Sequence, residues 1–191
     1  MLNRNSERIF TLDRANCCMI SVDMQDKILS ATIDHEVITK KALGILDIAN
    51  MLSIPTVSIT HCVDKMGPVT ESLSSVLSSG SSYTKETFSI FRTPEIERGI
   101  DELKRDQLIL FGVETHICVV QSALDARELG YNVFVVEDAC SSIRLDDKKS
   151  SLDRMRMAGV SVLSAQAVAF ELIEKAATDE FKKVFPIAKT L

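Results

Sequence analysis

A cysteine at the start of a predicted helix is the first residue of this sequence that could do chemistry. Cys118 lies in the stretch LILFGVETHICVV, where an apolar run reaches Gly112 and a helical pattern follows. The N-terminus of a helix carries partial positive charge and free N–H groups, which favour a thiolate and can bind an oxyanion. Free cysteine is also among the most buried residue types, so a structural thiol is the alternative. A base and a cation close to Cys118 would favour the nucleophile.

Two residues could supply that base and that cation. Asp23 directly follows an apolar run in SVDMQ, and a carboxylate at the C-terminal end of a strand can orient or deprotonate a nucleophile. Lys85, in YTKETFSIF, follows a Ser-rich stretch, and a lysine beside a cysteine lowers the pKa of the thiol. Each also has an ordinary interpretation, because Asp23 would serve as a turn residue and Lys85 as a solvated surface charge.

The histidines His61 and His116 are weaker candidates for the base. His116 is two residues from Cys118 on the predicted helix, so it points to a different face. His61 follows a predicted strand and could reach the same crevice. Only Asp64 stands at ligand spacing from His61, so we expect no metal site and no other cofactor.

Strand and helix patterns alternate along the chain. Apolar runs with β-branched residues predict strands, and helical periodicity with capping residues predicts helices. The Ser- and Gly-rich residues 64–84 are expected to form an excursion or loop. The strands are expected at 17–22, 55–60, 107–113, 131–138 and 160–163, and the helices at 34–54, 93–106, 114–130, 145–159 and 164–176, with one short helix in the tail, 178–191.

The predicted strands are apolar rather than alternating, which indicates a sheet covered on both faces. With helices between the strands, this pattern predicts an α/β fold with a parallel sheet of about six strands. The 191 residues are enough for a single domain, 1–191, with a full core. Ligands of such sheets bind at the C-terminal ends of the strands, near the switch in strand order. Asp23, His61 and the Gly112 turn all stand at such ends.

The composition favours an intracellular protein with neither nucleic-acid nor membrane partners. The chain has 27 acidic and 22 basic residues, a formal charge of −5, whereas nucleic-acid binding normally needs a basic face. The five cysteines are odd in number and include no CxxC, so we infer a reducing compartment, the cytoplasm, with mitochondria as the alternative. No stretch approaches the roughly 20 apolar residues of a membrane helix. Residues 1–18 lack the apolar core of a signal peptide.

Three motifs in a fixed order resemble a known family. VDMQ, the lysine of TKETFSIF, and GVETHICVVQSALDARELGYNVFVVEDACSS are similar to the isochorismatase-like cysteine hydrolases, over about residues 15–175. GVETHICV, DACSS and SLDRMRMAGV resemble the branch of isochorismatase domain-containing proteins, which includes trypanosomatid proteins once labelled as a ribonuclease. The order Asp, Lys, Cys, each at the end of a strand, is the catalytic arrangement of that family.

The resemblance implies a doubly wound, Rossmann-like three-layer sandwich with a mostly parallel six-stranded sheet in the order 3-2-1-4-5-6. It implies Asp23 as base, Lys85 as the cation that stabilises the thiolate, and Cys118 as the nucleophile that cleaves a small amide or related acyl compound through a thioester. It also implies a cis peptide bond before Glu114, with the backbone N–H groups of Glu114 and Cys118 as an oxyanion hole. The candidates for contact with a small-molecule substrate are Gln25, His61, Phe88, Phe91 and Thr115.

Departures from the family narrow the reaction. True isochorismatases cleave a vinyl ether without a covalent cysteine, so Cys118 favours amidase-like chemistry. Nicotinamidases of the family hold a metal with an aspartate and histidines after the second strand, and THCVDKMG does not keep that pattern. Glu114 would either repel an anionic substrate and oppose thiolate formation or point into a subunit contact, and the sequence does not choose between these.

Two other functions compete with hydrolysis. A catalytically silent binding or scaffold protein would keep the fold, with Met155, Met157 and the apolar tail at Phe181–Phe185 in an interface rather than in the core. A nuclease is suggested only by the label on related proteins, and the acidic balance disfavours it. The resemblance also implies a homo-oligomer, and the tail, 177–191, is the candidate for part of the subunit contact.

Overall fold

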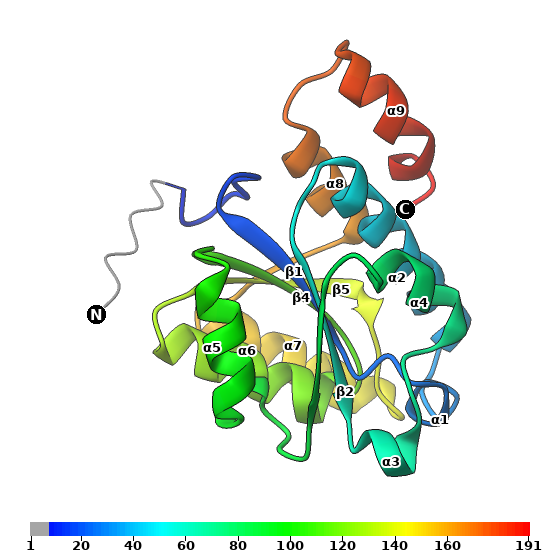
Figure 1. Cartoon of the computed structure of the whole chain (residues 1–191), viewed down its shortest axis with the longest axis vertical. Coiled ribbons are helices and arrows are strands. Elements are labelled where there is room, and N and C mark those ends of the chain that lie inside the picture. The colour runs from blue at the N-terminus through cyan, green and yellow to red at the C-terminus, as the bar shows by residue number, and fades with distance from the viewer. Residues whose placement is uncertain (1–7) are drawn as a thin grey trace.

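A six-stranded parallel sheet forms the centre of the molecule, as Figure 1 shows for the computed structural model, which describes residues 8–191. The strand order is β3-β2-β1-β4-β5-β6, and each pair of neighbouring strands is parallel, which confirms the predicted order. The expectation for the N-terminal residues 1–18 falls partly outside the described range. The strands are β1 (Cys17–Val22), β2 (Thr56–His61), β3 (Ser81–Lys85), β4 (Gln107–Gly112), β5 (Asn132–Cys140) and β6 (Ser161–Leu163).

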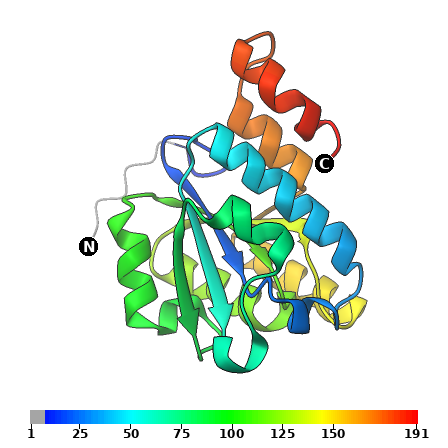
Figure 2. The same cartoon turned by 45° about the vertical axis from the view of Figure 1, so that its right-hand side comes forward.

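Helices cover both faces of the sheet and complete a three-layer sandwich. In Figures 1 and 2, α2, α8 and α9 lie on one side of the sheet, and α5, α6 and α7 lie on the other. Within residues 8–191, no helix is both long enough and apolar enough to cross a membrane. The helices are α1 (Asp26–Leu29), α2 (His35–Met51), α3 (Val63–Met66), α4 (Glu71–Leu77), α5 (Pro94–Glu102), α6 (Val120–Glu128), α7 (Leu145–Met157), α8 (Ala165–Ile173) and α9 (Asp179–Ala188), with single turns η1 (Ile90–Arg92) and η2 (Thr115–Val119).

The burial of the central strands explains why they appear in the sequence as apolar runs. Every residue of β1 and β4 is buried, and the two strands pair in register from Cys17 beside Gln107 to Val22 beside Gly112. Full burial of one large aliphatic side chain contributes about 1.5–3 kcal/mol to folding. Because both faces of these strands are covered, every position gains from an apolar residue and no alternation is needed.

The expected loop at 64–84 is wrong, because this segment contains most of α3, all of α4 and nearly all of β3. Helix α4 buries only Leu73 and Leu77, so its apolar pattern is too short to be seen. Strand β3 is the edge strand, and its residues Ser81–Thr84 are exposed or half-buried. An edge strand needs no apolar run, so the Ser-rich sequence of β3 did not predict a strand.

The tail forms a helix that packs on the body of the protein. Helix α9 contacts α2 and α8 and buries Val184 and Ala188. The Phe185 ring stays 38% exposed and stacks on Phe181 at 4.9 Å between centroids. On α7, Met155 is buried and Met157 is 89% exposed, so only Met155 is a core residue of the chain. A subunit contact through the tail stays a prediction.

Replacing Gly112 by alanine is expected to lower the free energy of unfolding by roughly 2–5 kcal/mol. Gly112 has a φ of +129°, and a Cβ atom there would collide with the Val22 carbonyl of the neighbouring strand. Gly130 is a matched control, because its φ is +87° and a Cβ would meet no atom within 4 Å. Gly130→Ala should cost about 1–2 kcal/mol from its backbone conformation alone. Urea melts of both variants measure the difference, and equal losses would contradict the proposed clash.

Candidate active site

Three strand ends bring Asp23, Lys85 and Cys118 together. Asp23 follows β1 in a left-handed conformation with a φ of +53°, and Lys85 is the last residue of β3. Cys118 lies in η2, directly after β4. Because parallel strands end at the same edge of the sheet, residues that are 62 and 33 positions apart in sequence become neighbours.

The Lys85 ammonium is the centre of the cluster. Its Nζ donates to Asp23 Oδ2 at 2.7 Å and to Cys118 Sγ at 3.5 Å. Asp23 and Lys85 are 1% and 2% exposed, and Cys118 is 6% exposed. Lys85 is therefore not a solvated surface charge, because a buried ammonium needs charged or polar partners such as these.

Burial and charge set the protonation state of the cluster. Burial raises the pKa of Asp23, and the Lys85 ammonium opposes that rise. Burial, followed by the Asp23 carboxylate, raises the pKa of Cys118 to about 12, although Lys85 lowers it. Burial and the Asp23 carboxylate therefore act against Lys85, the group of the cluster that favours the Cys118 thiolate. Asp23 Oδ1 is buried and meets no hydrogen-bond partner among the described residues.

The segment around Cys118 is more irregular than the helix expected at 114–130. The Val113–Glu114 peptide bond is cis, η2 is a π-helical turn, and α6 begins only at Val120. The Glu114 carbonyl accepts the N–H groups of Ile117, Cys118 and Val119 at 3.1, 3.1 and 3.2 Å. The Glu114 N–H meets no acceptor within residues 8–191. One of the two implied oxyanion donors is therefore free, and the other is shared with a carbonyl that has two further donors.

The side chains of Glu114 and His116 are turned towards the segment after β5. Glu114 Oε2 accepts the Ile143 N–H at 3.1 Å and lies 3.5 Å from His116 Nδ1. His116 Nδ1 also lies 3.0 Å from Ser142 Oγ. Both side chains therefore have partners in or next to the segment that follows β5, and Glu114 is also among the residues that line the cavity described below.

A cavity of about 250 Å³ opens over the cluster. Asp23, Glu114, Cys118, His61 and Lys27 belong to its lining, and the Lys27 ammonium donates to the Lys65 carbonyl at 2.7 Å. The Phe88 ring, 52% exposed, stacks on His61 at 5.8 Å between centroids. The apolar lining residues are Ile28, Ala31, Met66, Phe88 and Ile117. The sequence analysis named only Phe88 among these; Ile28 and Met66 belong to four-residue helices, which are too short for a periodic pattern.

Two of the five candidates for substrate contact, His61 and Phe88, line this cavity, and three do not. Gln25 is fully buried, accepts the His61 N–H at 2.7 Å, and donates to the carbonyls of His61 and Gly67 at 3.1 and 2.5 Å. The Thr115 hydroxyl donates to the Ser141 carbonyl at 2.8 Å. Phe91 is buried against Tyr131, with 5.6 Å between ring centroids. Gln25 and Thr115 therefore hold the ends of β2 and β5 in place.

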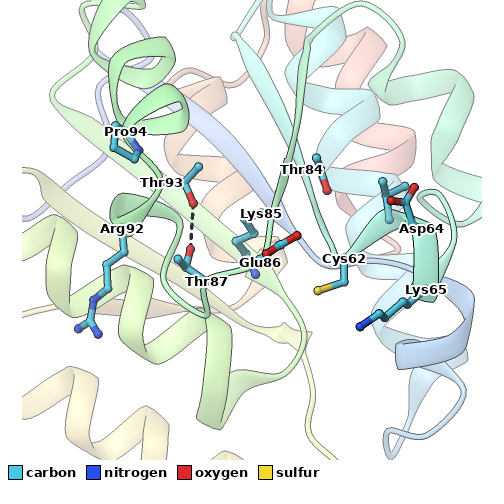
Figure 3. Close-up of a pocket in the computed structure, with 11 residues that line it drawn as sticks. Cys62, Asp64, Lys65, Thr84, Lys85, Glu86, Thr87, Arg92, Thr93 and Pro94 are labelled. Carbon is cyan, nitrogen blue, oxygen red and sulfur yellow. Dashed lines mark hydrogen bonds between the residues drawn. The ribbon is translucent and has the colours of Figure 1, made fainter.

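A second, wider groove of about 710 Å³ lies beside β3 and is shown in Figure 3. Lys85 belongs to its lining, whereas Asp23 and Cys118 do not. Acidic and basic side chains alternate around it, among them Asp64, Lys65, Glu86 and Arg92. Within residues 8–191, no three His, Cys, Asp or Glu side chains are grouped so that they could hold a metal ion.

Known proteins resemble this chain in both sequence and structure. The isochorismatase domain matches residues 17–167. Isochorismatase domain-containing protein 2 of Xenopus laevis is 32% identical, over 93% of this chain and 85% of that protein. The YcaC gene product of Escherichia coli, described as an octameric hydrolase of unknown specificity, superposes with a TM-score of 0.87 at 25% identity, over 97% of this chain and 96% of that chain. A Caenorhabditis elegans structure named Mar1 ribonuclease has a TM-score of 0.87 at 28% identity, over 93% and 91% of the two chains.

Proposed function

We propose that this chain, which belongs to the isochorismatase family, is a cysteine hydrolase of small amides or related acyl compounds. The observation that carries the proposal is the buried contact of Lys85 with both Asp23 and Cys118 at the base of a cavity. A nucleophile, a base and a cation within hydrogen-bond reach of one another are the parts that covalent acyl transfer needs.

Acylation begins with a thiol, because the pKa of Cys118 is raised to about 12. As the sulfur attacks the carbonyl carbon, the thiol proton passes to Asp23, and the C–S bond forms. The raised pKa of Asp23 makes this carboxylate a stronger base than an ordinary aspartate. When the tetrahedral intermediate collapses, the C–N bond breaks and the leaving amine takes the proton from Asp23.

The oxyanion of that intermediate is held by backbone N–H groups. The unpaired N–H of Glu114 is the first donor. The Cys118 N–H is the second, because the Glu114 carbonyl keeps the N–H groups of Ile117 and Val119 when an oxyanion competes for it. One such donor typically contributes about a hundred- to a thousandfold to the rate.

Deacylation needs water and the same base. Asp23 takes a proton from a water molecule, whose oxygen attacks the thioester carbon. The C–S bond then breaks, the sulfur regains the proton, and a carboxylic acid leaves. Lys85 stays charged throughout and balances the negative charge that moves between Asp23 and Cys118.

The size and lining of the cavity favour a substrate with a small and uncharged acyl group. Its volume of about 250 Å³ and its apolar walls suit a short aliphatic or single-ring compound. Asp23 lines it, and one oxygen of its carboxylate has no partner among the described residues, so a substrate with its own carboxylate would be repelled. A homo-oligomer is part of the proposal, supported by the octameric YcaC relative, and light scattering of the purified chain tests it.

Trapping the acyl-enzyme tests the proposal directly. The protein is incubated with a panel of small uncharged amides and activated esters, quenched in acid, and digested for mass spectrometry. We expect an acyl mass on Cys118 and none on Cys17, Cys18, Cys62 or Cys140, together with release of amine. A panel that leaves no adduct and no product would favour the silent binding protein.

Nuclease activity is the second function to be tested, because one structural relative is named Mar1 ribonuclease. The formal charge of −5 and the small apolar cavity do not favour an RNA substrate. Cleavage of RNA that survives Cys118→Ser would replace the hydrolase proposal.

A further inference from the structure

The Lys85 ammonium has three N–H donors and is buried, so it needs three acceptors. Two of them are Asp23 Oδ2 and Cys118 Sγ. The third is His61 Nδ1, at 3.4 Å from Nζ. His61 stands beside Lys85 in the register of β2 and β3, so the sheet itself sets this contact. With His61 included, each donor of the buried cation has a partner.

This contact decides which nitrogen of His61 carries the proton. An ammonium only donates, so Nδ1 must be the acceptor, and the neutral ring then has its hydrogen on Nε2. Nε2 lies 3.5 Å from the sulfur of Cys62, the neighbour that Figure 3 shows at the edge of the groove beside Lys85. Burial, followed by the charge of Lys85, lowers the pKa of His61 and so favours the neutral ring.

The surroundings of His61 hold the ring in place. The Gln25 amide bonds both the N–H and the carbonyl of His61, and the Phe88 ring stacks on the imidazole. The charged groups that act on the ring are Lys85, Asp23 and Glu86, and the Thr87 backbone also favours its protonated form. Only Lys85 opposes protonation among these, and it is the group in direct contact.

We infer that His61 is a positioning residue, which fixes the Lys85 ammonium between Asp23 and Cys118 through Nδ1 and supports the Phe88 wall of the cavity through its ring. This inference rests on the proposed function and adds to it a residue with two separable tasks. The first task acts on Cys118 through Lys85. The second acts on the substrate through Phe88.

Two substitutions separate these tasks. His61→Phe keeps a ring for Phe88 to stack on but removes the acceptor. His61→Asn removes the ring, while its amide oxygen can reach the position of Nδ1 and accept from Lys85. Thermal melts and circular dichroism are recorded first, so that only folded variants are compared.

The first readout is the rate of Cys118 alkylation by iodoacetamide against pH, which needs no substrate. Without its third acceptor, the ammonium is held less firmly and lowers the pKa of Cys118 less. His61→Phe should therefore move the alkylation profile to higher pH by about one unit, and His61→Asn should keep the profile of the unchanged protein. An unchanged profile in His61→Phe, or equal shifts in both variants, would overturn the inference.

The second readout is kinetic and uses an amide from the acyl-trapping panel. His61→Phe should lower kcat about ten- to a hundredfold with little change in KM, since one hydrogen bond to a charged group is lost. His61→Asn should raise KM with a smaller change in kcat. If no amide is turned over, the proposed function fails, but the alkylation profiles still decide whether His61 positions Lys85. A KM increase in His61→Phe with an unchanged kcat would contradict the assignment of its two tasks.

Discussion

Cys118→Ser is expected to lower kcat/KM for an amide substrate by roughly 10⁴- to 10⁶-fold. A serine hydroxyl is a much weaker nucleophile than a thiol unless a base removes its proton fully. The local base, Asp23, is already paired with Lys85 at 2.7 Å. The substitution changes one atom in a well-packed place, so the fold should be kept. The loss is measured as amine release under saturating and limiting substrate.

Cys17→Ser is the matched control for this change. Cys17 is fully buried at the start of β1, at the other end of the strand from Asp23. Its sulfur lies 3.8 Å from the Arg14 carbonyl, where a hydroxyl would also find an acceptor. The control should keep its activity within a few fold. Loss of activity in both variants, or in neither, would contradict a nucleophilic role for Cys118.

Asp23→Asn is expected to separate the reactivity of Cys118 from turnover. The Asp23 carboxylate raises the pKa of Cys118, so removing its charge should bring the thiol pKa down from about 12 and shift alkylation to lower pH. Turnover should fall about a hundred- to ten-thousandfold, because an amide cannot accept the thiol proton or activate water. A variant that alkylates more readily and hydrolyses less is the expected result.

Lys85→Met should shift alkylation in the opposite direction. Lys85 is the group that lowers the pKa of Cys118, so its loss should move the profile to higher pH. It also leaves Asp23 buried without its ion-pair partner, which typically costs about 3–5 kcal/mol of stability. Iodoacetamide labelling of the two variants against pH, followed by peptide mass spectrometry, measures both shifts. Shifts of the same sign would contradict the charge arrangement described for the cluster.

The sequence by itself determined the layered α/β fold and singled out Asp23, Lys85 and Cys118 as candidate groups. Strands β1 and β4 are buried along their whole length, and most of their positions carry apolar residues. Asp23 follows β1 directly, and Cys118 lies in the turn η2 that comes shortly after β4. The end of each of these strands is visible in the sequence as the end of an apolar run. The order of Asp23, Lys85 and Cys118 resembles that of a known family, and this resemblance predicted the strand order of the sheet.

Helices and strands that bury few residues could not be predicted from apolar runs. Strand β3 carries Lys85, yet it lies at the edge of the sheet and is mostly polar, so the strand that positions the cation was taken for a loop. The residues of the cavity wall could not be predicted either. Ile28 and Met66, for example, belong to four-residue helices, which are too short to show a periodic pattern.

Only the tertiary structure decided how the groups act on one another. A sequence gives the type of each residue, whereas a pKa depends on distance and on burial, which the fold sets between residues far apart in the chain. Lys85 lowers the pKa of Cys118, as expected, but burial and the Asp23 carboxylate raise it, and the sequence shows neither of these two effects. Gln25 turned out to clamp His61 rather than to face the cavity, and His61 became the third acceptor of Lys85 through the register of β2 and β3. These contacts join separate strands, so no local pattern in the chain could record them.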